Sequence, residues 1–382
     1  MDALDCSISM FSYLCSYHQV PPSFLDNLFL FGSTLEPLDW GLAGFRQDNT
    51  LVTRKEAVLS IPRLGRSGRE IRHSYSLRGV EPSDSVPNWP WSIRQIAVYQ
   101  SFDVVTGRTV LITIKGNSLM KDRIVDSISD GQTIRPDSFD DISSTFAANL
   151  EINAGIFLWV DENWRWCVND MEKNIRPIVN KAKTAKIDVE PRFRDMPEDI
   201  KHSVSRAGTF RSKMTAQTNT LVGSTKSEPT GINRFIKRFS FKRDTVPLIT
   251  ADRPSAPAGG KDSPQNQLDS LLILDMFSFE EMQKLQDTGE KVQEALLVHK
   301  INLAVLGQIR ASYQEQSESM SSPELDIIMS GCRNELISFY SRISGIENNM
   351  KIRIEQLESL VQLVKDAKDL VSLTWGAMGL GT

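Results

Sequence analysis

The chain has 382 residues, a formal net charge of −4 at pH 7, 40% hydrophobic and 24% charged residues, which allows two or three domains with at least one packed core. The small net charge gives no case for a nucleic-acid partner, and four cysteines without a CxxC pair argue against a disulfide framework and a zinc site. Neither a signal sequence nor a run of about 18 apolar residues is found, so we expect a cytoplasmic protein without a transmembrane helix.

Residues 1–85 are expected to form an irregular N-terminal segment, because Pro and Gly residues interrupt it repeatedly. A short helix is predicted within it from Ser23 to Phe31, with Ser23 as the N-cap. Residues 63–69 are expected to form a basic, glycine-rich loop.

A mixed α/β domain is predicted over residues 86–187. The runs Ser92–Phe102 and Thr109–Ile114 are rich in β-branched residues and flank a Thr106-Gly107 turn, so they predict a β-hairpin. Residues 164–166 are expected to add a strand or to continue the core. Helices are predicted at Met120–Ser129, Ser144–Val160 and Met171–Ile187, the last with a kink or a restart at Pro177.

Residues 188–267 are predicted to be a flexible linker, because Pro, Ser, Thr, Gly and basic residues dominate them. The simplest interpretation is a solvated linker. The alternative is contact with an anionic membrane surface or a partner, which phosphorylation of Ser240 would weaken. The basic residues that would make this contact are interleaved with phenylalanines, and they are Arg234, Lys237, Arg238, Lys242 and Arg243.

A long-helix bundle or coiled-coil stalk is predicted over residues 268–375. One helix should begin at Ser322-Pro323, since Pro is favoured at the first helical position, and Ser344-Gly345 is expected to bend the chain further on. The last helix then carries apolar or small residues in alternating steps of three and four, which is the heptad pattern of a coiled coil. These residues are Ile343, Ile346, Met350, Leu357, Leu360, Val364, Ala367 and Val371, with Arg353 as the one defect.

The heptad face has two interpretations. It is either buried in an intramolecular bundle or used in an intermolecular coiled coil. A partner acid or a solvated seam would explain Arg353 at a core position. In the intermolecular case the residues that hold an oligomer together would be Ile346, Met350, Leu357, Leu360 and Val364.

Little in the sequence indicates catalysis or metal binding. Asp130, Asp137, Asp140 and Asp141 are candidate oxygen ligands for a divalent cation, although a solvated loop is the commoner interpretation of such a run. The four histidines are isolated and have no acidic companion at ligand spacing. We therefore predict no catalytic residues and a protein that is not an enzyme. An enzyme whose Asp and His residues converge on folding is the alternative.

A series of short strings follows the predicted elements in order. They are Pro90–Gln95 leading into Tyr99–Asp103, Ile114–Asn117, Asn163–Trp166 with Asn169–Glu172, Phe277–Leu285, and Gly331-Cys332. As an ensemble the chain resembles, from about Phe24 to Leu373, the CorA-like transporter domain proteins of filamentous fungi. The resemblance implies a relationship to CorA-type magnesium transporters. In these, α/β domains and a long stalk helix precede two transmembrane helices, five copies assemble, and cations bound between the domains gate the pore.

The chain departs from this family at its C-terminal end. The string Gly376–Gly379 does not match the Gly-Met-Asn motif of the family, and no apolar span precedes it. We therefore expect an α+β protein that corresponds to the cytosolic portion without its pore, as a fragment or as a paralogue. It would act by homo-oligomerisation, by joining full-length relatives or by regulation, and magnesium is the only cofactor implied. The alternative is a stand-alone interaction or regulatory protein that contacts a membrane surface or a partner through the basic linker and the coiled coil.

Overall fold

The computed structural model describes residues 6–29, 31, 44–51, 60–129, 134, 136–184, 278–318 and 322–377. Residues 1–184 and 277–373 belong to one unit. The predicted α/β domain and the predicted helical section therefore pack together instead of forming two separate domains. The α+β fold class is confirmed, whereas the predicted linker at 188–267 lies outside the described residues.

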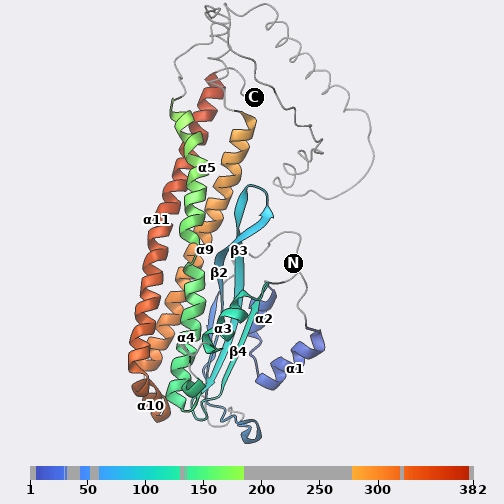
Figure 1. Cartoon of the computed structure of the whole chain (residues 1–382), viewed down its shortest axis with the longest axis vertical. Coiled ribbons are helices and arrows are strands. Elements are labelled where there is room, and N and C mark those ends of the chain that lie inside the picture. Colours follow the sequence, from blue (N-terminus) through green and yellow to red (C-terminus); the bar gives the residue numbers. More distant parts are fainter. Residues whose placement is uncertain are drawn as a thin grey trace, which may run out of the picture. The chain divides into compact units, whose positions relative to one another are not determined.

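A four-stranded antiparallel sheet forms the centre of this unit, in the order β1-β2-β3-β4. Its strands are β1 (Phe45–Gln47), β2 (Glu70–Val86), β3 (Trp89–Asp103) and β4 (Thr109–Lys115). The predicted β3–β4 hairpin is confirmed, and Gly107 in its turn has φ +73°, a conformation that favours glycine. The β2–β3 hairpin is the long one, and Figure 1 shows it rising beyond the end of β4.

The prediction that residues 1–85 are irregular was wrong, because β2 contributes 17 residues to the sheet. Strands are recognised by alternating apolar and polar side chains when one face meets solvent. Both faces of β2 are covered instead, and polar side chains such as His73, Ser76 and Arg78 are as deeply buried as Leu77. Ile71, Tyr75 and Leu77 do alternate with polar residues, so the strand pattern was present in the sequence and was overlooked, with His73 as its one interruption.

The helices match most of the predicted ones. They are α1 (Ile8–His18), α2 (Ser23–Phe29), α3 (Leu119–Ser129), α4 (Ile142–Asp161), α5 (Trp164–Thr184), α9 (Phe279–Glu318), α10 (Pro323–Gly331) and α11 (Arg333–Ala377), with short 3₁₀ turns at Pro62–Leu64 and Pro136–Phe139. The predicted start at Ser322-Pro323 is confirmed, and the Ser322 hydroxyl accepts a hydrogen bond from the Leu325 N–H at 3.2 Å. Residues 164–166 begin α5 instead of forming a strand. Pro177 lies inside this helix, and α11 continues through Ser344-Gly345.

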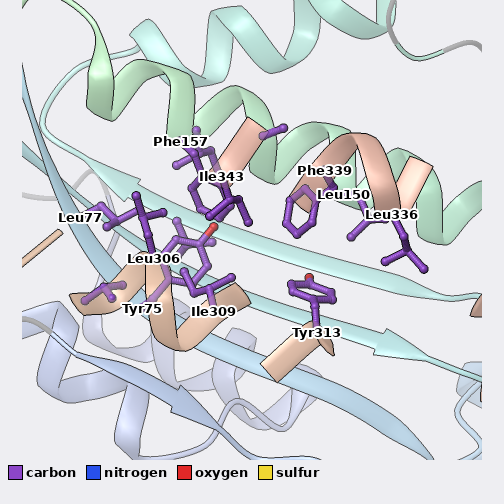
Figure 2. Packing of buried hydrophobic residues seen from close by; sticks show 14 of the residues in the cluster. Tyr75, Leu77, Leu150, Phe157, Leu306, Ile309, Tyr313, Leu336, Phe339 and Ile343 are labelled. Carbon is purple, nitrogen blue, oxygen red and sulfur yellow. The ribbon is translucent and has the colours of Figure 1, made fainter. Parts of the chain in front are cut away.

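Apolar cores cover both faces of the sheet. Ile96 and Val98 of β3 join the core that contains α4, α9 and α11, whereas their neighbours Ala97 and Tyr99 pack with Phe24 of α2 on the other face. Consecutive residues of a strand point to opposite faces, which is why one strand serves both cores. Figure 2 shows the larger core, where side chains from β2, α4, α9 and α11 meet. Those labelled are Tyr75, Leu77, Leu150, Phe157, Leu306, Ile309, Tyr313, Leu336, Phe339 and Ile343.

Past the end of the sheet, α5, α9 and α11 continue side by side (Figure 1). Ion pairs join them, Lys181 of α5 with Glu281 of α9 at 2.8 Å and Lys300 of α9 with Glu358 of α11 at 2.7 Å. Gly289 of α9 provides room for Val364 of α11, because a β-carbon there would lie 3.0 Å from a Val364 methyl group. No helix among the described residues is long and apolar enough to cross a membrane.

Candidate functional site

The predicted acidic metal site is not assembled. Both carboxylate oxygens of Asp141 bind Ser144, and Asp141 is thereby the N-cap of α4. Asp137 lies in a 3₁₀ turn that ends just before Asp140, and Asp130 lies outside the described residues. Within the described ranges no three His, Cys, Asp or Glu side chains are grouped closely enough to hold a metal ion. The described candidates, Asp137, Asp140 and Asp141, are therefore not grouped for cation binding.

The other two predicted sites are the basic segment and the heptad face of α11, and only the second lies in the described part of the chain. The basic residues from Arg234 to Arg243 lie outside the described part of the chain. The heptad residues of α11 are described, and each is at most 7% exposed within a single chain; they are Ile346, Met350, Leu357, Leu360 and Val364. An oligomer would have to form through other residues or after this bundle opens.

What the fold does bring together is a seam between the N-terminal half of the chain and the long helices α9, α10 and α11. Here we call it the coupling seam, and its members are Arg69, His73, Arg78, Glu151 and Asp161 on one side and Asn302, Ser312, Gln316, Glu324, Arg342, Asn349 and Arg353 on the other. The partners are 188 to 255 residues apart in sequence. Such distances leave no local pattern, so the seam was not predicted.

The innermost contact of the seam joins α9 to the edge of β2. The Asn302 side chain accepts a hydrogen bond from the Arg78 N–H at 3.0 Å and donates one to the Arg78 carbonyl at 2.6 Å. Asn302 is fully buried. β1 pairs with β2 at residues 73–75, and in the described part of the chain no strand pairs with this edge of β2 at Arg78. The amide of Asn302 supplies the donor and the acceptor that a strand would have supplied.

A second buried contact joins the same two elements. His73 Nε2 lies 3.0 Å from the Ser312 hydroxyl and 3.1 Å from the Gln316 amide nitrogen. The ring also packs edge-on against Tyr313, with centroids 5.0 Å apart. Burial lowers the pKa of His73 to about 3, so the ring is neutral at physiological pH. His73 and Ser312 are both buried, so this contact aligns α9 on β2.

The outer part of the seam fixes α11 to α4. Asp161, the last residue of α4, accepts hydrogen bonds from Asn349 at 2.9 Å and from Arg353. This acid is the partner that the heptad defect at Arg353 required. One further contact, between Arg342 and Glu151 at 2.6 Å, lies lower on the same two helices. Arg69 and Glu324 form an ion pair where α10 approaches the sheet.

His299 lies beside this outer part, on α9. It is fully buried, its Nδ1 is 2.8 Å from the Ala295 carbonyl, and its ring packs against Trp164 with centroids 4.3 Å apart. Burial lowers its pKa to about 4. His299 is therefore a neutral core side chain.

A shallow hollow of about 440 Å³ lies between the tip of the β2–β3 hairpin and α5. Its walls are held together by a hydrogen bond of 2.8 Å from the Trp91 indole to Asp170, and Lys291 of α9 lies over the Trp89 ring at 5.3 Å. The residues that line it are Asp84, Val86, Pro87, Asn88, Trp89, Pro90, Asp170, Lys173 and Asn174. These contacts pin the hairpin tip onto the helices.

One comparison with known proteins gives a match. Residues 1–183 match the family model described as CorA-like transporters. The matched region ends at the end of α5, so α9, α10 and α11 lie beyond it. No curated protein and no solved structure matches the chain.

Proposed function

We propose that this chain is a CorA-like domain with a regulatory role, in which the sheet and α1–α5 set the position of α11. It would act as a non-enzymatic module of a divalent-cation transport system at the cytoplasmic face. It would associate with further copies of itself or with full-length CorA-like relatives. This proposal rests on the similarity of residues 1–183 to CorA-like transporters.

The observation that carries the proposal is the coupling seam. α11 is 45 residues long and is fixed to the matched region near its start by Arg342 and near its middle by Asn349 and Arg353. A displacement of α4 or of the sheet would therefore be transmitted along a rigid helix. The apolar face of α11 is already buried within the chain. This favours a role in which α11 transmits movement over a role in which its apolar face packs against other subunits around a pore.

Association is proposed through the end of the bundle formed by α10 and α11. Ile327 and Ile337 remain 69% and 58% exposed there, whereas the heptad residues are buried. Exposed large apolar side chains on adjoining elements are typical of interaction surfaces. The surface that associates would therefore differ from the heptad face that the sequence indicated.

The test is the molar mass of the purified chain in solution, measured by light scattering after size exclusion, with and without millimolar magnesium. We expect an oligomer that Ile337→Asp dissociates and Ser338→Asp does not. Ser338 is the matched control, because it is the exposed neighbour of Ile337 and the same charge is added. A monomer at all concentrations, with or without magnesium, would contradict the proposal.

A further inference from the structure

A second hollow lies on the outer surface between α5 and α11. Its volume is about 290 Å³. Its polar lining consists of two guanidinium groups, Arg165 and Arg353, and three carboxamides, Asn169, Asn349 and Gln356. No carboxylate lines it. A lining with two positive charges, several amide donors and no carboxylate is suited to an anion.

The donors of this hollow are available. Arg353 uses Nη1 for Asp161, and its other guanidinium donors have no hydrogen bond to any residue that the structure describes. Arg165 is exposed and lies over the neighbouring Trp166 ring at 5.2 Å. Asn169 and Gln356 likewise have no hydrogen-bonded side-chain partner within the described ranges. Arg165 and Asn169 also lie in the first two turns of α5, where the helix dipole favours negative charge.

The charged groups around the hollow leave its electrostatic potential positive. Asp161 contacts the lining, where it accepts hydrogen bonds from two donors, Arg353 and Asn349. One turn further along the same face of α5, Glu172 is paired with Arg176. His299, which lies behind Arg353 and Asp161, is neutral because burial lowers its pKa to about 4. Two guanidinium groups against one shared carboxylate leave a net positive charge at the hollow.

We propose that this hollow binds the phosphate group of a small organic phosphate. The forked donors of Arg165 and Arg353 suit tetrahedral phosphate oxygens, and the carboxamides add further donors. The remaining two lining residues are apolar, Val168 and Ile352, and they provide a surface for the organic part. The volume is at the lower end of ligand sites, which favours a compact ester over a dinucleotide.

A bound phosphate would join two parts of the chain that are nearly 200 residues apart. α5 belongs to the region similar to CorA-like transporters, and α11 lies beyond it. The ligand would thus add a contact between them next to the Asp161–Arg353 pair. This inference does not depend on the proposed transport-related role, because the site would exist whatever the chain associates with.

The experiment is calorimetric titration of the full chain with inorganic phosphate and with glycerol 3-phosphate, at constant ionic strength. Sodium chloride serves as the blank. We expect saturable binding, tighter for the ester, and a loss of roughly tenfold or more in affinity for Arg165→Gln, since a charge-assisted hydrogen bond is removed. Lys183→Gln is the matched control: Lys183 is exposed near the far end of the same helix, the same charge is removed, and the affinity should stay within about twofold of the original.

Vesicles of phosphatidylcholine containing phosphatidic acid distinguish a lipid headgroup from a free ester. Binding to these vesicles that depends on Arg165, with no binding of free esters, would identify the headgroup as the source of the phosphate. Absence of binding to phosphate, ester and vesicles would overturn the proposal. Equal losses for Arg165→Gln and Lys183→Gln would also overturn it, because binding would then reflect overall charge. Arg165 is exposed, so its replacement should leave the fold intact.

Discussion

Replacing Asn302 by Leu removes the side chain that completes the edge of β2. The Arg78 N–H and carbonyl are buried at this point and would lose both partners. Each buried backbone group left unpaired costs about 1–3 kcal/mol, and burial of the leucine offsets about 1.5–3 kcal/mol. We therefore expect the free energy of unfolding to fall by about 2 kcal/mol, which corresponds to a melting temperature roughly 4 °C lower for a unit of this size.

The assay is urea unfolding followed by circular dichroism, with amide hydrogen exchange at Arg78 as the local readout. Asn348→Leu is the matched control, because Asn348 is exposed on α11 and its replacement should change stability by less than about 0.5 kcal/mol. Exchange at Arg78 should accelerate in the Asn302 variant only. A loss of less than about 1 kcal/mol, with unchanged exchange at Arg78, would refute the assignment of Asn302 as the edge partner of β2.

Three further predictions concern packing, pH and the basic segment. Gly79→Ala should destabilise the chain by about 1–3 kcal/mol in thermal unfolding, because the new β-carbon would lie 3.0–3.2 Å from the Trp159 ring, whereas Gly155→Ala, with open space around it, should not. The pKa values of His73 and His299 are lowered to about 3 and 4, so the unfolded chain binds more protons than the folded chain below about pH 6.5. The free energy of unfolding should therefore fall from pH 6.5 toward pH 4. His299→Phe should reduce the slope of this free energy against pH, and an unchanged slope would contradict the prediction. The segment from Arg234 to Arg243 should bind anionic vesicles in low salt and release them in high salt, with Ser240→Glu weakening binding; co-sedimentation that is insensitive to salt would count against it.

Helices and strands could be predicted from the sequence where local signals, such as turn glycines, β-branched runs and helix caps, mark them. The β3–β4 hairpin has a turn glycine and β-branched runs, and α10 has a Ser-Pro start, so both were predicted. β2 was missed although Ile71, Tyr75 and Leu77 alternate with polar residues. His73 interrupts the alternation, and its buried partner, Ser312, comes from a distant part of the chain. The heptad pattern of α11 correctly indicates a buried face. A repeat alone, however, does not specify whether the covering helices come from the same chain.

The candidate sites were less predictable than the fold. An acidic run such as Asp137 to Asp141 has the composition of a cation site. The same carboxylates can also cap a helix, however, and the Asp141 carboxylate caps α4. The coupling seam and the phosphate hollow are made of residues that the sequence separates widely. Arg165 and Arg353 have no shared motif, and only the parallel course of α5 and α11 brings them to one hollow.

The contact between Asn302 and β2 also has a consequence for synthesis on the ribosome. The strand leaves the exit tunnel more than 200 residues before the helix that closes its edge. At 5–20 residues per second, this delay is on the order of ten seconds or more. During that time the nascent sheet has an open edge at Arg78 and an unfilled core beside Tyr75, which is the kind of surface that chaperones bind. Fragments that end near residue 184 should accordingly aggregate when expressed alone, even though they contain the whole sheet.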